Sequence, residues 1–174
     1  MQQTVTTSST KGIVLALILI IIALATYFLN MNQSSALQYI SYVVFIAGII
    51  WSVVSYGKQV EYNSTFGNYF AHGFKTAATV TAIMIIYVII FVNLFPDMKE
   101  KAMDAARKSM EAKGNLTQEQ ITQALGFTQK FFTVFLIAGT LVGYLIFGAI
   151  AFLIGSGITK KNPRPFENDI NQIR

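Results

Sequence analysis

The residues of this chain that are equipped for chemistry are few. The sequence of 174 residues has one histidine and no cysteine, so it offers no thiolate metal site, cysteine nucleophile or disulfide. The acids and bases closest to its apolar runs are Glu61, His72, Asp97 and Glu100, and their spacing matches no reaction. The GxxxxGK[ST], GxSxG and HExxH patterns of phosphate-binding loops, hydrolases and metalloproteases are absent. The sequence therefore predicts a protein that is not an enzyme and uses neither metal nor cofactor.

The histidine lies in a segment that predicts an amphipathic helix. In the stretch TFGNYFAHGFK, the residues Phe66, Phe70 and Phe74 recur every four positions and so share one face of a helix. A helix with such a face, placed before a membrane span, is typical of the membrane surface. We therefore expect the three phenylalanines and His72 to be interfacial. A histidine there can sense pH, but a simple polar role beside lipid headgroups is more common.

The composition is that of a membrane protein. Hydrophobic residues make up 53% of the chain and charged residues 12%, whereas soluble domains carry about 25% charged residues. Four apolar runs are long enough to cross a bilayer as helices: 12–29, 36–56, 76–95 and 131–158. The first is longer than the apolar part of most signal peptides and no A-x-A-type cleavage site follows it, so we expect a retained span. The predicted fold class is an all-α membrane protein with four transmembrane helices and an interfacial helix before the third.

The fourth run, 131–158, is the segment on which the others are expected to pack. It has no Asp, Glu, Lys, Arg or His, and as a helix it would reach ~42 Å, beyond the ~30 Å thickness of the hydrocarbon core. Small residues recur along it four or eight positions apart. Because lipid tails are as apolar as leucine, helices in a bilayer are held by close backbone approach, which small residues permit. The predicted helix-packing residues are Gly139, Gly143, Ala151 and Gly155.

Residues 97–130 form the longest polar region and predict a helical hairpin outside the bilayer. The first arm is rich in helix-forming residues of both charges and is expected to end near Gly114. Thr117 then fits the N-cap of the second arm, and Gln120 three residues later completes a capping box. The second arm is expected to run without a break into the fourth span.

The basic residues suggest an orientation, although their counts on the two sides almost tie. Seven Lys and Arg fall on the side of the termini: Lys11, Lys58, Lys75, Lys160, Lys161, Arg164 and Arg174. Six fall on the other side: Lys99, Lys101, Arg107, Lys108, Lys113 and Lys130. The basic residues that flank the first and fourth spans favour cytoplasmic termini. The net charge of +5 points to anionic lipid as a partner rather than to nucleic acid.

These boundaries divide the chain into three parts. Residues 1–11 are expected to be a disordered tail, because they are polar and rich in Thr and Ser. Residues 12–159 are expected to form the four-span membrane domain. Residues 160–174 are expected to be a polar C-terminal tail, in which two prolines prevent a continued helix.

Several stretches together resemble one bacterial membrane family. They are the four spans, TFGNYFAHGFK before the third, MEAKGNLTQEQITQA before the fourth and the KK pair after it. The family is called domain of unknown function forty-one ninety-nine, and the resemblance covers roughly residues 11–161. It implies a small integral protein of the bacterial inner (cytoplasmic) membrane and brings no catalytic residues with it.

Two classes of function fit these observations. The first is a structural or accessory membrane protein that binds itself or a larger membrane complex through the fourth span and the hairpin. The second is a small transporter or channel for a neutral or lipidic solute, lined by Ser and Thr. The predicted spans lack the charged residues that most ion-coupled relays use, which disfavours the second class without removing it.

Overall fold

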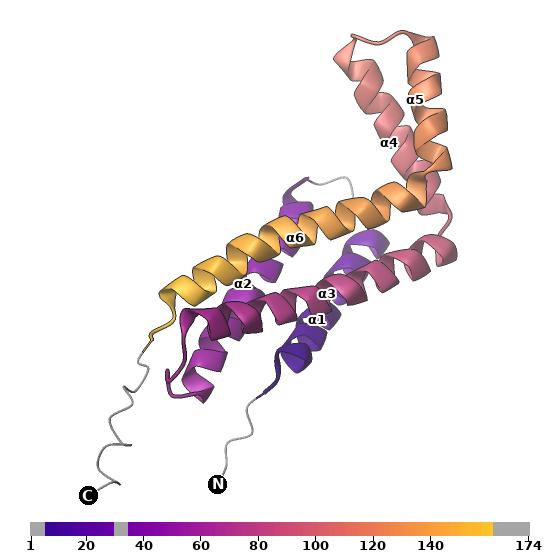
Figure 1. Cartoon of the computed structure of the whole chain (residues 1–174). Helices are drawn as coiled ribbons and strands as arrows, with labels where there is room; N and C mark the ends of the chain where they lie inside the picture. The colour runs from indigo at the N-terminus through magenta and orange to yellow at the C-terminus, as the bar shows by residue number, and fades with distance from the viewer. Residues whose placement is uncertain (1–5, 30–34, 162–174) are drawn as a thin grey trace, which may run out of the picture. The chain divides into compact units, whose positions relative to one another are not determined.

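The residues that the computed structural model of the chain describes, 6–29 and 35–161, form α-helices joined by short connections. The helices there are α1 (Ser8–Phe28), α2 (Ser35–Gln59), α3 (Phe66–Leu94), α4 (Asp97–Lys113), α5 (Gln118–Lys130) and α6 (Phe132–Ile158) (Figure 1). Of these, α1, α2, α3 and α6 are long and apolar enough to cross a membrane. The structure thus confirms the predicted all-helical chain with four candidate spans, as in a multi-pass membrane protein.

The first helix begins before the apolar run. Thr7 is its N-cap, and the Thr7 hydroxyl accepts a hydrogen bond from the backbone N–H of Thr10 at 3.2 Å. Threonine is a favoured N-cap because its oxygen satisfies an amide that the helix itself leaves unpaired. Residues 8–11, assigned to the tail from their composition, are therefore helical. Residues 1–5 and 162–174 of the two predicted tails lie outside the described residues.

The third apolar run and the amphipathic segment before it form one helix. α3 extends from Phe66 to Leu94 without interruption, and Pro96 separates it from α4, as its missing N–H predicts. A tight turn precedes α3, in which Glu61 and Tyr62 have left-handed φ angles of 52° and 59°. The interfacial position of the first turns of α3 stays a prediction.

The helices divide between two compact units. Unit 1 comprises residues 1–83 and 144–174, and unit 2 comprises residues 84–143. In unit 1, α1, α2, the first part of α3 and the last part of α6 lie side by side, and the ring of Phe45 in α2 meets Tyr144 of α6 edge-on at 4.7 Å. All four contribute buried apolar side chains, among them Leu15, Leu19, Phe45, Ile49, Val53, Val80, Ala151 and Phe152.

Unit 2 contains the pair α4 and α5, which pack along each other (Figure 1). Gly114 ends α4 with a left-handed φ of 66°, a conformation that glycine adopts without strain. Thr117 begins α5, and its hydroxyl accepts from the Gln120 amide while the Gln120 side chain accepts from the Thr117 amide. The predicted helix end and capping box are confirmed. The position of this pair outside a bilayer stays a prediction.

The prediction that α5 runs unbroken into the fourth span is wrong at one residue. Phe131 separates α5 from α6 and has φ −107° and ψ 18°. Backbone bonds from Phe131 to Phe127 and from Phe135 to Phe131 continue on both sides, at 3.1 and 2.9 Å. The helix therefore bends sharply there, as Figure 1 shows, rather than ending. Residues 127–135 contain neither proline nor glycine, the usual sequence signs of a bend.

Candidate functional site

Glycines set the distance between the helices of unit 1. A Cβ added to Gly73 of α3 would lie 2.5 Å from Cβ of Phe152 in α6 and 2.7 Å from Cγ2 of Val53 in α2. A Cβ at Gly48 of α2 would collide with the side chain of Leu15 in α1. These helices approach so closely only because the glycines lack a side chain. Similar close neighbours surround Gly12, Gly57, Gly148 and Gly155.

The predicted packing residues of α6 lie in two different surroundings. Ala151 is fully buried, and a Cβ at Gly155 would lie 3.1 Å from Cβ of Val53. Gly139 is exposed with no atom within 4 Å of an added Cβ, and Gly143 is partly exposed. A helix turns about 100° per residue, so members of the two pairs, which are eight, twelve or sixteen residues apart, differ by roughly 80–160° around its axis. The two pairs thus face different directions, and the contact expected at Gly139 and Gly143 stays a prediction.

Polar side chains meet in the interior of unit 1. Ser52 of α2 is only 1% exposed, and its Oγ lies 3.3 Å from Nε2 of His72 and 3.1 Å from Oγ1 of Thr76. The ring of His72 stacks on Tyr56, with centroids 4.2 Å apart and planes 8° apart. His72, which the sequence places at a membrane surface, is 8% exposed and held between α2 and α3. We call Ser52, Tyr56, His72 and Thr76 the polar cluster.

The donor and the acceptor of each hydrogen bond in the polar cluster can be assigned. Thr76 donates its single hydroxyl proton to the carbonyl oxygen of His72 at 2.9 Å, so its Oγ1 accepts from Ser52. Ser52 then has no second proton to offer, and the Nε2–H of His72 donates to it. This chain of donors assigns a proton to Nε2 of the imidazole. The hydroxyls of Ser52 and Thr76 both have partners, and together with His72 they join α2 to α3.

Lys11 of α1 brings a cation to the edge of the polar cluster. Its side chain is 5% exposed, and Nζ donates to the backbone oxygen of Ser52 at 3.1 Å and to Oγ of Ser55 at 3.2 Å. The ring centroid of Trp51 lies 5.9 Å from Nζ. All of these partners are neutral, and no carboxylate of the described residues pairs with Lys11. The sequence predicts this lysine just before the first span, whereas the structure places it within α1 and against α2.

Two buried oxygens of unit 1 have no hydrogen-bond partner among the described residues. They are the hydroxyl of Tyr69 in α3 and Oε1 of Gln59 in α2. Tyr69 is fully buried, with its ring edge-on to Tyr56 at 5.9 Å. The Gln59 side chain does donate from Nε2 to Oγ1 of Thr6, at 3.4 Å. A buried oxygen without a hydrogen bond lowers the stability of a fold by about 1–3 kcal/mol. A polar group that donates a hydrogen bond to either atom would therefore bind favourably.

The phenylalanines predicted to be interfacial differ in their surroundings. Phe66 and Phe74 are 43% and 49% exposed, whereas Phe70 packs edge-on against Phe152 of α6 at 4.7 Å. Phe74 also approaches Phe152, at 6.0 Å. The four-residue spacing therefore serves a helix–helix contact as well as an exposed face.

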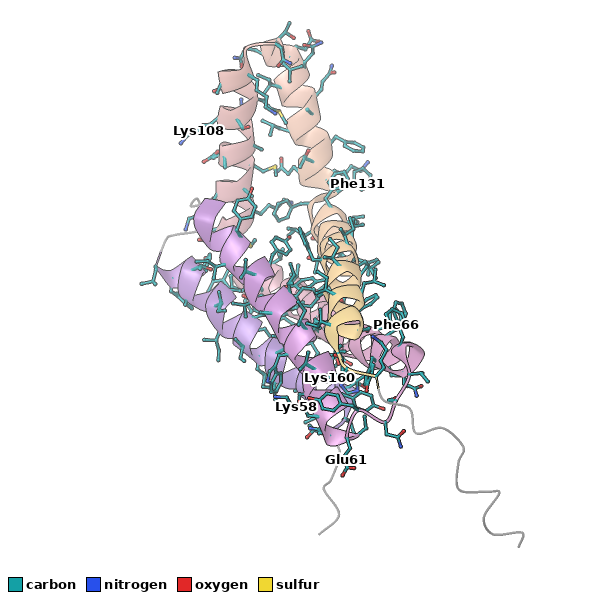
Figure 2. All side chains as sticks on the ribbon, turned by 90° about the vertical axis from the view of Figure 1, so that its left-hand side faces the viewer. Lys58, Glu61, Phe66, Lys108, Phe131 and Lys160 are labelled. Carbon is teal, nitrogen blue, oxygen red and sulfur yellow. The ribbon has the colours of Figure 1, made fainter. Side chains whose placement is uncertain are left out.

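One end of unit 1 collects positive charge. Figure 2 shows Lys58 of α2 and Lys160 after α6 at this end, together with Glu61 and Phe66. Nζ of Lys161 lies 5.7 Å from the ring centroid of Phe66. Lysines from separate helices thus converge where α2, α3 and α6 meet.

Sequence reasoning missed the link between Lys11, Ser52 and Thr76. His72 and Thr76 are four residues apart, so they share a helix face, and Ser52 and Ser55 are three apart, but hydroxyls in spans also return to their own backbone. Only the packing of separate helices shows which of them pair. Among the described residues, no group of three or more His, Cys, Asp or Glu side chains lies together to hold a metal ion.

Comparison with known proteins finds one matching family. No curated protein and no solved structure matches the chain. The family described as "Protein of unknown function (DUF4199)" matches residues 10–161, which include the polar cluster, the α4–α5 pair and all of the four candidate spans except the first two residues of α1. Since this match covers most of the sequence, the chain belongs to the DUF4199 family.

Proposed function

We propose that the protein is a structural or accessory component of the bacterial inner membrane that associates with itself or with a larger membrane complex and catalyses no reaction. The observation that carries the proposal is the surface of α6. Large apolar side chains are exposed along its part in unit 1, including Leu145, Ile146, Ile150, Leu153 and Ile154. In unit 2 the same helix leaves Gly139 open, with room for another backbone to approach.

The test replaces Gly139 and Gly143 together by leucine. If this surface binds another helix, leucine side chains will push the helices apart, and the protein will shift to a smaller species in mild detergent. Light scattering coupled to size-exclusion chromatography measures that shift, and a thermal melt measures stability. Gly157→Leu is the matched control, because Gly157 also lies in α6 with no atom within 4 Å of an added Cβ.

Two results would count against the proposal. Unchanged size and stability in the double variant would mean that Gly139 and Gly143 touch lipid only. An equal change in the Gly157→Leu control would mean that leucine anywhere on α6 perturbs the protein. Proteins that co-purify with the wild type but not with the double variant would point to a larger complex rather than to self-association.

The second candidate is a small transporter or channel for a neutral or lipidic solute. The unpaired oxygens of Tyr69 and Gln59 favour it, because both are buried and would accept hydrogen bonds from a solute. Solute entry into proteoliposomes, compared between wild type and Tyr69→Phe, tests it. Entry of any neutral solute above that of empty liposomes, reduced by the substitution, would favour transport over the accessory role.

A further inference from the structure

We propose that Lys11 binds the phosphate of an anionic phospholipid at the basic end of unit 1. This site is independent of the association proposed above, since it lies between α1 and α2 and uses no residue of α6. The ligand is a lipid whose phosphate meets the ammonium group and whose acyl chains run along α1.

The ammonium group of Lys11 has three N–H donors, and the described residues accept hydrogen bonds from two of them. The two acceptors are the Ser52 carbonyl and the Ser55 hydroxyl. The bond to Ser52 is buried, whereas the bond to Ser55 is partly buried, so the ammonium group lies at the edge of the packed interior. The ligand oxygen would meet the third donor from the side of Ser55, which is partly exposed, since Lys11 itself is only 5% exposed.

The charge of Lys11 is not neutralised by the described residues. Its partners among these residues are a carbonyl, a hydroxyl and the Trp51 ring, all uncharged. A cation held in apolar surroundings is costly unless an anion accompanies it, and lysines near the ends of membrane helices reach for the headgroup layer. An anionic oxygen on the third donor would supply that missing charge.

The surface beside Lys11 favours a lipid over a free anion. Val14 and Ile18 follow Lys11 on the same side of α1, three and seven residues on, and are 49% and 44% exposed. Trp51 is 60% exposed, and tryptophan is enriched at the level of lipid headgroups. Lys58 and Lys160 at the same end add a field that attracts anionic lipid. The phosphate of a lipid would thus meet Lys11, its headgroup would lie at the level of Trp51, and its acyl chains would lie along the apolar side of α1.

The experiment compares phosphatidylglycerol with phosphatidylcholine of identical acyl chains, titrated into the detergent-solubilised full chain and followed by native mass spectrometry. We expect phosphatidylglycerol to bind about tenfold more tightly, and Lys11→Gln to abolish that difference, as the loss of one charge-assisted hydrogen bond predicts. Lys11→Arg should keep it. Lys58→Gln is the matched control, because Lys58 is exposed at the same end, and it should lower affinity less than about twofold.

A second measurement needs no variant. Trp51 is the only tryptophan of the chain, so its fluorescence reports on the neighbourhood of Lys11. In liposomes, phosphatidylglycerol with brominated acyl chains should quench this fluorescence more than brominated phosphatidylcholine at the same mole fraction. Equal quenching by the two lipids, or equal loss of affinity in Lys11→Gln and Lys58→Gln, would overturn the site. Displacement of phosphatidylglycerol by millimolar inorganic phosphate would overturn the lipid and leave a site for a free anion.

Discussion

Gly73 and Gly67 lie in the same helix, α3, but have different neighbours. A Cβ at Gly73 would press on Phe152 and Val53, whereas the nearest atom to a Cβ at Gly67 is Oγ1 of Thr65, at 3.8 Å. We predict that Gly73→Ala destabilises the protein, because overpacking costs about 1–3 kcal/mol. A thermal melt in detergent would show this as a lower unfolding temperature.

Gly67→Ala is the matched control for that substitution. It introduces the same methyl group into the same helix, and alanine favours a helix over glycine by about 1 kcal/mol, so stability should stay the same or rise. Equal melting temperatures for the two variants would mean that α2 and α6 do not approach α3 as closely as the structure shows.

The chemistry of single residues could be predicted from their types but not from their neighbours. The absence of cysteine excludes a thiolate metal site, whereas the expectation that the chain uses no metal at all stays a prediction. The burial of His72 could not be predicted, since its partner Ser52 lies on another helix, separated from it by a turn. Lys11 was placed in a tail for a similar reason, because the carbonyl that it contacts belongs to α2.

The side chain of Thr117 determines where α5 begins. We predict that Thr117→Ala lowers the local stability of α5 by about 1 kcal/mol, since alanine cannot accept the hydrogen bond of the Gln120 amide. Amide hydrogen exchange across residues 118–125 should become faster by about fivefold to tenfold, which is the same free energy expressed as a rate.

Thr122→Ala serves as the control for the cap. Thr122 is exposed within α5 and its hydroxyl donates only to the Gln118 carbonyl of its own helix, at 2.8 Å. Alanine is the better helix former there, so exchange should stay the same or slow down. Faster exchange in both variants would assign the effect to the loss of any threonine rather than to the cap.

The ends of elements were predictable where a local signal marks them. Pro96, Gly114 and Thr117 each act on the backbone within a few residues, and the helix boundaries that they predict are those of the structure. The bend at Phe131 has no such signal. The rings of Phe127 and Phe131 lie 4.9 Å apart beside it, but side chains four residues apart are also neighbours in a straight helix.

The topology of the whole molecule is the next prediction. Both termini are expected in the cytoplasm, because an even number of spans returns the chain to its starting side and lysines flank the first and fourth spans. A reporter fused after Arg174 should therefore be active in its cytoplasmic form. A reporter fused into the loop at Gly114 should be active only in its periplasmic form, and the reverse pattern would refute the orientation.

At this largest scale, composition sufficed for the fold class and for four candidate spans, because apolar length alone decides whether a helix can cross a bilayer. The packing of the helices within unit 1 could not be predicted from composition. A search for glycines four apart selects Gly139 and Gly143, whereas the closest approaches in unit 1 involve Gly48, Gly57 and Gly73, which belong to no such pair. Which glycine faces a neighbour depends on how the separate helices rotate against one another.

The contact of Gly73 and Val53 with Phe152 also determines when unit 1 is completed during synthesis. Phe152 belongs to α6, and all of α4 and α5 must leave the ribosome before it does. Until then the face of Gly73 that packs on Phe152 lacks its α6 partner, although Gly48 of α2 can already meet Leu15 of α1, since insertion precedes packing. A chain truncated before α6 would leave that face of Gly73 uncovered permanently. Such a chain should be recognised as unassembled and degraded, so the last helix to emerge decides how long the first three survive.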